Sequence, residues 1–268
     1  MEEYRKKEKK NFKGNFHKEE TEELSSDLIE GRNAVTEALR SGRTIDRVFI
    51  AEGDTDKALS RLAGMAREAG AVVKTADRRK LDAMSQSGAH QGIIAFAAAH
   101  DYASVDEILA VAEERGEPPL IVVCDEISDP HNLGAIIRTA ECAGAHGVII
   151  PKRRNVGLTA VVGKTSAGAL EYMKVARVAN LSSTLESLKK KGLWVFGTAA
   201  SGDRLLYDAD LKGPAVIVIG SEGFGMSRLV EESCDFKVRI PMKGAINSLN
   251  ASAAAAIFLY EAVRQRRE

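Results

Sequence analysis

Three short segments in the second half of the chain combine glycine with side chains that could bind a ligand or take part in catalysis. In the first, Gly220-Ser-Glu-Gly-Phe-Gly225, Glu222 stands in a glycine-rich turn that follows an apolar run. A turn of this kind at the carboxyl end of a buried strand lets a ligand approach the backbone closely. Glu222 has few neighbours to pack against, so it either faces a ligand or pairs with the positive end of the next helix.

The second segment, Asp129 to Arg138, reads D-P-H-N-L-G-A-I-I-R. An aspartate followed by proline is typical of a helix start, although Asn132 could cap the helix instead. Arg138 falls on the polar side of this helix, one turn after Gly134, whose missing side chain leaves room above the helix. The alternative is a surface pair of Arg138 with Glu141, which contributes only a few tenths of a kcal/mol. Periodicity alone favours that surface pair.

The third segment, Ile240 to Asn250, ends a strand, turns through a glycine loop and enters an alanine-rich run. We expect Asn247 or Ser248 to cap the helix that follows. Polar side chains at a helix N-terminus, where free N–H groups point outward, suit an anionic or oxygen-rich ligand. Simple helix capping is the alternative.

Two common nucleotide-binding signatures are excluded by spacing. Gly163-Lys-Thr165 resembles the end of a P-loop, but Leu158 stands where the first glycine of that motif is required. The turn at Gly220 has the order G-x-x-G-x-G, which is not the G-x-G-x-x-G fingerprint of dinucleotide sites. The chain also shows no cluster with the spacing of metal ligands.

These segments require a buried parallel sheet to position them. Continuous apolar runs alternate with amphipathic ones, which is typical of a parallel α/β domain covered on both faces. The predicted strands are 120–124, 147–151, 193–198, 215–220 and 236–241. The predicted helices are 131–143, 182–191, 226–233 and 249–266.

The first half of the chain predicts a separate, smaller α/β domain. Residues 1–27 are charged and poor in aliphatics, so we expect a disordered tail. Residues 28–100 predict helices at 31–40, 56–69 and 78–84 and strands at 47–51, 72–75 and 92–99. The acidic segment 101–119 ends in Pro-Pro, which favours a linker before the second domain at 120–268.

Charge and composition limit the function classes. The 38 Lys and Arg balance the 38 Asp and Glu, which argues against a protein that binds nucleic acids through a strong overall positive charge. Each of the two predicted domains nevertheless has a small basic excess, offset by acidic residues in the tail and linker. Candidate phosphate contacts, each also interpretable as a solvated surface charge, are Arg32, Arg78, Arg79, Lys80, Lys152, Arg153 and Arg154.

Localisation follows from what the sequence lacks. No apolar stretch is long enough to span a membrane, and the N-terminus lacks the apolar region of a secretory signal. Three widely spaced cysteines fit reduced structural thiols rather than disulfides or a zinc site. We therefore expect a cytoplasmic protein without a metal.

The three segments, in this order, resemble the three motifs of the SpoU/TrmH family of RNA ribose 2'-O-methyltransferases, in the SPOUT superfamily. The shared patterns are D-P-x-N-x-G-x-x-x-R, G-S-E-G-x-G and I-P-M-x-G-x-x-x-S-L-N. The resemblance covers residues 120–265, and residues 29–39 and 88–93 are similar to the two ends of the family's small substrate-binding domain. Within the family, the chain is most similar to members that methylate a guanosine of 23S rRNA.

The resemblance implies an α/β domain with a deep C-terminal trefoil knot, S-adenosyl-L-methionine as cofactor, and a homodimer. The positions that match the family's cofactor-binding backbone are Thr198, Gly220, Ile240 and Leu249. The positions that match its functional side chains are Asn132, Arg138, Glu222, Ser248 and Asn250.

Methyl transfer from a sulfonium to a ribose hydroxyl is an in-line displacement that needs alignment and stabilisation of a developing alkoxide. Because the pKa of arginine lies above about 12, Arg138 suits a cation that binds phosphate and stabilises the alkoxide better than it suits a base. The proton would then go to phosphate, to water or to an arginine perturbed by the site. Asn132, Ser248 and Asn250 would position the ribose or Arg138. Glu222 would orient Arg138 or a substrate donor.

Two alternatives stay open. The same reaction could act on a tRNA loop or on another rRNA nucleotide, including a resistance-type methylation. From another class, the chain could be a non-catalytic RNA-binding factor in ribosome assembly. The complete set of Arg138, Glu222, Ser248 and Asn250 argues against that second alternative.

Overall fold

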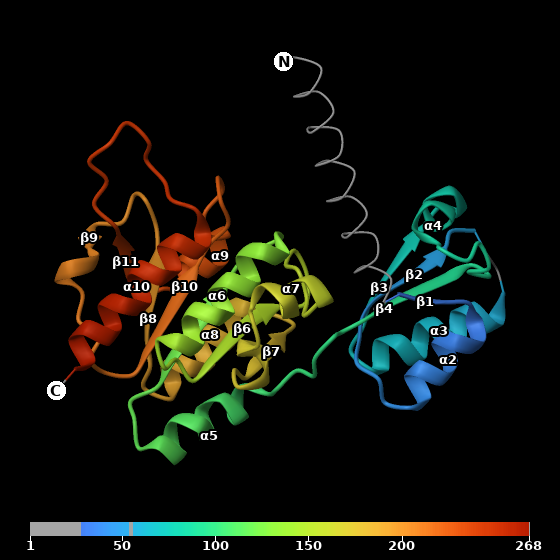
Figure 1. Cartoon of the computed structure of the whole chain (residues 1–268), viewed down its shortest axis with the longest axis horizontal. Coiled ribbons are helices and arrows are strands. Elements are labelled where there is room, and N and C mark those ends of the chain that lie inside the picture. Colours follow the sequence, from blue (N-terminus) through green and yellow to red (C-terminus); the bar gives the residue numbers. More distant parts are fainter. Residues whose placement is uncertain (1–27, 54–55, 268) are drawn as a thin grey trace, which may run out of the picture. The chain divides into compact units, whose positions relative to one another are not determined.

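The computed structural model describes residues 28–53 and 56–267, which form two units (Figure 1). The first unit comprises the described residues up to His100 together with Leu158–Val161. The second comprises Asp101–Gly157 and the chain from Val162 onward. The tail predicted for residues 1–27 lies outside the described residues.

The first unit is a four-stranded mixed sheet with helices on both faces. Its strands, in the order β1-β4-β2-β3, are β1 (Leu28–Glu30), β2 (Ile45–Ala51), β3 (Val72–Ala76) and β4 (Ile93–Ala97). Strand β4 pairs antiparallel with β1 and β2, whereas β2 and β3 are parallel.

Helices α2 (Arg32–Arg40) and α3 (Lys57–Glu68) bury Val35, Leu59 and Ala66 against one face of this sheet. Helix α4 (Arg78–Met84) packs Leu81 on the other face, against Phe49. The predicted elements of this region are confirmed, and β1 was not predicted.

The second unit is built on a seven-stranded, wholly parallel sheet. The strands, in the order β7-β6-β5-β10-β8-β11-β9, are β5 (Leu120–Cys124), β6 (Gly147–Pro151), β7 (Val175–Val178), β8 (Trp194–Thr198), β9 (Arg204–Leu205), β10 (Ala215–Ile219) and β11 (Phe236–Arg239). Every residue of the two central strands, β5 and β10, is buried, which explains their continuous apolar sequence.

Helices cover both faces of this sheet. On one face, α5 (Val105–Arg115), α8 (Leu181–Lys190) and α9 (Arg228–Glu232) bury Ile108, Leu185 and Val230. On the other, α6 (Pro130–Cys142) packs beside α10 (Ala251–Arg266) (Figure 1). The remaining short helices are α7 (Ala160–Thr165), η1 (Ala169–Glu171) and η2 (Leu206–Asp208).

The segment expected to be a linker instead belongs to the second unit. Its helix α5 is capped by Ser104 and inserts Ile108, which is fully buried, into the core. Gly147 at the start of β6 makes room for it, because a Cβ there would lie 2.5 Å from the Ile108 side chain. The acidic composition reflects only the exposed face of this helix.

The order of the last strands along the sheet differs from their order along the chain. Strand β10 lies between β5 and β8, and β11 lies between β8 and β9. Each of these two strands is thus inserted between two strands that precede it in the sequence. The α/β class is confirmed. The trefoil knot stays a prediction, with which this interleaved order agrees.

Candidate active site

A cavity of about 310 Å³ lies at the carboxyl ends of β8, β10 and β11. This is the edge at which parallel α/β sheets bind ligands. All four residues predicted from the resemblance to contact the cofactor line it: Thr198, Gly220, Ile240 and Leu249.

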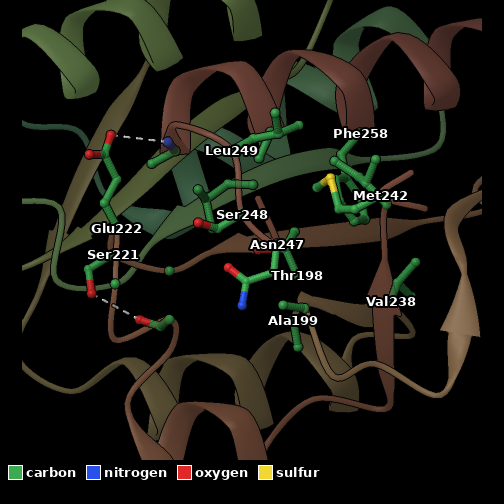
Figure 2. Close-up of a pocket in the computed structure, with 18 residues that line it drawn as sticks. Thr198, Ala199, Ser221, Glu222, Val238, Met242, Asn247, Ser248, Leu249 and Phe258 are labelled. Atoms are coloured by element: carbon green, nitrogen blue, oxygen red, sulfur yellow. Dashed lines mark hydrogen bonds between the residues drawn. The ribbon is translucent and has the colours of Figure 1, made fainter. Parts of the chain in front are cut away.

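Polar and apolar groups lie at different ends of this first cavity (Figure 2). Ser221 and Glu222 lie at one end, and Met242 and Phe258 lie at the other. Ser248, a predicted functional residue, lies between these ends. The site therefore offers hydrogen-bonding groups beside an apolar surface, which is typical of a small-molecule pocket.

The glycine-rich turn is tightly closed on itself. The backbone N–H of Ser221 donates to the carbonyl of Gly225 at 2.9 Å, and the reverse bond is 3.0 Å long. A Cβ on Gly220 would lie 2.3 Å from the Gly225 carbonyl carbon and 2.4 Å from the Met226 nitrogen. Glycine at position 220 is therefore a steric requirement of the turn.

The exit of the turn is fixed by a buried carboxylate. Asp125, directly after β5, accepts a 2.6 Å hydrogen bond from the backbone N–H of Ser227. It is only 4% exposed. The same residue donates its backbone N–H to the carbonyl of Ile219 at the end of β10. The turn is thus attached to two adjacent strands.

Three predicted site residues from three different segments meet at Glu222. Its Oε1 accepts hydrogen bonds from the side-chain amides of Asn132, at 2.9 Å, and Asn250. It also accepts the backbone N–H of Ala251 at 3.3 Å (Figure 2). The Asn250 amide donates to Asn132 Oδ1 at 2.9 Å, which closes the cluster. We refer to Asn132, Glu222 and Asn250 as the polar wall.

Asn250 also corrects the predicted cap of the last helix. Its Oδ1 accepts the backbone N–H groups of Ser252 and Ala253 at 2.9 and 3.2 Å, so Asn250, rather than Asn247 or Ser248, is the N-cap of α10. One side chain therefore ends the loop, starts the helix and contacts Glu222. Asn247 and Ser248 lie free to line the cavity.

Helix α6 carries Asn132 in its first turn. Asp129 is the N-cap, with its carboxylate 2.9 Å from the His131 N–H, so the cap predicted first is confirmed. The space above Gly134 is filled by α7, since a Cβ there would lie 2.7 Å from Thr165 Cβ. That glycine serves close helix packing and leaves no room for a ligand.

Arg138 is not brought to the polar wall. It lies six residues after Asn132 on α6, which is about 9 Å along the helix axis and about 120° around it. Its side chain is exposed, and it makes no hydrogen bond or ion pair with any described residue. It lines neither cavity. Within one chain, therefore, neither Glu222 nor Asn132 orients Arg138.

A second cavity, of about 380 Å³, adjoins the first at Glu222 and is also lined by Asn132. It shares Ser221, Glu222 and Ala251 with the first, and its other lining residues follow β5, β6 and β10. Sequence reasoning missed this cavity. Asn132, Glu222 and Arg154 were candidates from the sequence, but nothing there indicated that they line one cavity together with Phe224.

The available chemistry is that of positioning and charge. Within residues 28–53 and 56–267, no group of histidine, cysteine and carboxylate side chains could hold a metal. Cys124 and Cys234 are free thiols, and burial raises the pKa of each to about 12, so neither is a nucleophile at neutral pH. No helix in the described part of the chain could cross a membrane.

Comparison with known proteins gives two family matches that together cover most of the chain. Residues 119–260 match the SpoU rRNA Methylase family. Residues 28–103 match the domain described as RNA 2'-O ribose methyltransferase substrate binding.

Individual relatives agree. YacO of Bacillus subtilis, whose name assigns it to the TrmH family of tRNA/rRNA methyltransferases, is 47% identical over 90% of this chain and 96% of its own length. The crystal structure of the SpoU methyltransferase AviRb from Streptomyces viridochromogenes with AdoMet is 28% identical, with a TM-score of 0.57 over 89% of each chain. A TrmH/SpoU tRNA modifying enzyme of A. aeolicus is 30% identical, with a TM-score of 0.51 over 60% of this chain and 83% of its own.

The first cavity fits the cofactor of this family. Its volume is in the range of small-molecule pockets, Gly220 leaves the backbone accessible, and Met242 and Phe258 provide an apolar surface at one end. When bound, S-adenosyl-L-methionine supplies a methyl group on a positively charged sulfur. The chain belongs to the SpoU/TrmH family of RNA methyltransferases and uses S-adenosyl-L-methionine as its methyl donor.

Proposed function

We propose that this chain methylates the ribose 2'-hydroxyl of a guanosine in 23S rRNA, the activity of the RlmB type. The observation that carries the proposal is the polar wall, whose Glu222 lines both cavities and whose Asn132 lines the second. A methyl donor in the first cavity and a ribose in the second would face each other across Glu222. The family's three motifs converge on this point.

The polar wall would act by alignment. Glu222 fixes the two asparagine amides through its Oε1 and leaves its other carboxylate oxygen for a ribose hydroxyl. Ser248, in the first cavity, would bind the acceptor oxygen as it approaches the methyl group. Holding the reacting atoms in line supplies much of the rate gain of such a displacement. The proton would leave to phosphate or water.

We further propose that the active form is a homodimer. Arg138 is exposed and points away from the polar wall of its own chain, although it matches a functional position of the family. The loop from Met242 to Asn250 is also exposed along its whole length and carries Ile246 and Leu249, 76% and 40% exposed. A second copy would cover these apolar side chains and bring Arg138 of the partner subunit to the site.

Mixed dimers test this arrangement. Arg138→Ala and Glu222→Ala should each be inactive alone, because each lacks one half of a site. Co-expressed in equal amounts, they should recover about a quarter of wild-type turnover, since half of the dimers would hold one intact site. No recovery in a mixed dimer isolated with two affinity tags would place Arg138 and Glu222 in the same chain's site.

The first unit would bind RNA. Arg78 and Arg79 are exposed at the start of α4 and make no ion pair with described residues. Cations at a helix N-terminus oppose the helix dipole, which favours a role in binding over one in stability. Arg32 is a poorer candidate than the sequence suggested, because its guanidinium pairs with Asp56 and donates to the Gln91 carbonyl.

A tRNA target is the alternative, favoured by the 30% identity to a tRNA modifying enzyme. The purified protein with labelled S-adenosylmethionine should methylate protein-free 23S rRNA from a strain that lacks the gene, and should leave bulk tRNA unlabelled. Label in tRNA alone would replace the rRNA target. A ribose-methylation map of the same strain would name the nucleotide. Fractionation should find the protein in the cytoplasm, with its substrate.

A further inference from the structure

The second cavity is lined by Asn132 and Glu222 of the polar wall and by three loops, which we call its rim. The loops follow β5, β6 and β10, which are neighbours in the sheet. They contribute Glu126, Arg154 and Phe224, in that order. None of these three residues takes part in the methyl transfer proposed for the polar wall, Ser248 and Arg138.

Phe224 is the most exposed large apolar side chain among the described residues, at 91%. A phenylalanine in water gains no burial energy and could be replaced by a polar residue without cost to the fold. It stands two residues after Glu222, at the tip of the glycine-rich turn. The position of this side chain therefore serves a contact that the folded chain does not itself make.

The turn holds Phe224 in place. Two backbone hydrogen bonds between Ser221 and Gly225 close a loop of only three residues, and the Ser227 bond to Asp125 anchors its exit. Gly223 and Gly225 adopt φ of 93° and 70°, which permits the tight return. A side chain on such a fixed support loses little entropy when it binds a ligand.

A cation faces Phe224 from the rim of the same cavity. Arg154 pairs with Glu126 at 3.0 Å, and both residues have left-handed backbone, with φ of 61° and 59°. The Asn155 side chain joins the two loops by accepting the Ile127 N–H at 2.7 Å. Strained backbone held by its surroundings often marks a binding site. Arg154 is 78% exposed, so it can exchange the half-buried Glu126 for another anion at little cost.

We propose that the second cavity binds the acceptor nucleotide, with its base stacked on Phe224 and its backbone phosphate paired with Arg154. The inference rests on the proposed RNA methylation, and it adds the residues that select and orient the nucleotide. Stacking on an aromatic face suits a base turned out of its helix, which is how single-stranded RNA is usually recognised. A ribose between that base and that phosphate would lie over Glu222, at the boundary with the first cavity.

Substitution of Phe224 gives the sharpest test, with protein-free 23S rRNA and bulk tRNA from the deletion strain as substrates. Phe224→Ala should lower kcat/KM for whichever RNA the wild type methylates by about 10- to 100-fold, because the loss of base stacking on one aromatic residue weakens binding by about that factor. Phe224→Trp should keep near wild-type activity, whereas Phe224→Leu should be about as impaired as Phe224→Ala. Affinity for S-adenosylmethionine should stay within about twofold, since Phe224 does not line the first cavity. Tyr172→Ala, at a residue 79% exposed and outside both cavities, is the matched control.

A spectroscopic signal separates stacking from a merely structural role. The chain has one tryptophan, Trp194, so Phe224→Trp in a Trp194→Phe background places a single reporter at the proposed contact. Its fluorescence should be quenched when the RNA that the wild type methylates binds to this variant. Unchanged fluorescence under saturating RNA would contradict a stacked base.

Arg154 is tested through salt dependence. Arg154→Ala should raise KM for the RNA and reduce the slope of log affinity against log salt by about one, as expected for one lost phosphate contact. Arg153→Ala, the neighbouring exposed arginine that does not line the cavity, should change the slope less. Equal slopes for Arg154→Ala and wild type would remove Arg154 from the proposal.

The outcomes separate the two levels of inference. If the wild type methylates no RNA, the proposed function fails. If the wild type methylates RNA and Phe224→Ala does so equally well, only the nucleotide site is overturned. If Phe224→Ala loses activity because it dissociates the protein, as seen by sedimentation, Phe224 is an interface residue and the proposal is likewise overturned.

Discussion

The polar wall and the rim of the second cavity differ in whether their side chains find partners within one chain. Asn132, Glu222 and Asn250 satisfy one another through hydrogen bonds and link helix α6, the glycine-rich turn and helix α10. On the rim of the second cavity, Phe224 is almost fully exposed and Arg154 is 78% exposed. Arg138, outside both cavities, makes no hydrogen bond with described residues. The wall is therefore formed before any ligand binds. The exposed side chains would gain contacts only when RNA or a second subunit binds.

This difference predicts two classes of variant. Changes in the wall should disturb the alignment of both cavities and the packing of the turn. Changes at the rim should leave folding and cofactor affinity intact and alter only steps that involve RNA or dimer contacts.

The largest effect should come from Arg138, which lies outside both cavities of its own chain. Arg138→Ala should lower turnover by at least about 1,000-fold, because the charge that stabilises the alkoxide would be lost. Cofactor affinity, measured by calorimetry, should stay within about twofold. Arg138→Lys should restore little, since a lysine cannot bind phosphate with two parallel N–H groups. Retained turnover in Arg138→Ala would remove this residue from the mechanism.

A wall residue should show a mixed effect. Glu222→Ala leaves two asparagine amides without their shared acceptor, so we expect turnover to fall by about 100-fold and the melting temperature to drop by a few degrees. Glu222→Gln keeps the shape, loses the charge, and should lie between Glu222→Ala and the wild type. If Glu222→Ala lost turnover with unchanged melting and unchanged cofactor affinity, the distinction between wall and rim would break down.

Gly220 tests the first cavity alone. Gly220→Ala places a Cβ 2.3 Å from the backbone of Gly225, so the turn must shift, at a cost of about 1–3 kcal/mol. Cofactor affinity should fall by about tenfold in calorimetry. Gly213→Ala is the control, since its Cβ would meet nothing within 4 Å. Equal cofactor affinity in both variants would contradict the role of the turn in holding the cofactor.

The smallest effect should lie in the first unit, which contains none of the predicted catalytic or cofactor-binding residues. Burial alone would raise the pKa of Glu30, but hydrogen bonds from Ser85, Ser87 and the N–H of Gln86 lower the pKa to about 2. The stabilisation is thus present above the ordinary pKa of 4.5 and is lost as pH falls through about 2. Glu30→Gln should melt lower than wild type at pH 6, and the gap should close by pH 2. A gap that is independent of pH would show that the hydrogen bonds do not depend on the charge.

The sequence predicted lining residues of the first cavity better than the rim of the second. Gly220 and its turn were recognisable because steric demand restricts that position to glycine. The partners of Glu222 were not, because contacts between Asn132, Glu222 and Asn250 depend on which strands become neighbours. Strand β10 reaches its place between β5 and β8 only through the interleaved order, which no local pattern encodes.

Two short edge strands and the burial of one helix were also missed, for physical reasons. Strands β7 and β9 lie at the edges of the sheet and have only four and two residues, too few for a periodic signal. The acidic surface of α5 concealed the burial of Ile108. An exposed Phe224 has no structural signature at all, since its role depends on a ligand.

The position of the transferred methyl group tests the central claim most directly. RNA methylated by the wild-type protein with labelled S-adenosylmethionine would be digested to nucleosides and separated by mass spectrometry. The account predicts that all label lies on the ribose of a single nucleoside, as its 2'-O-methyl derivative, and that Glu222→Ala transfers almost none. Label on a base, or no label in any RNA although the cofactor binds, would contradict it.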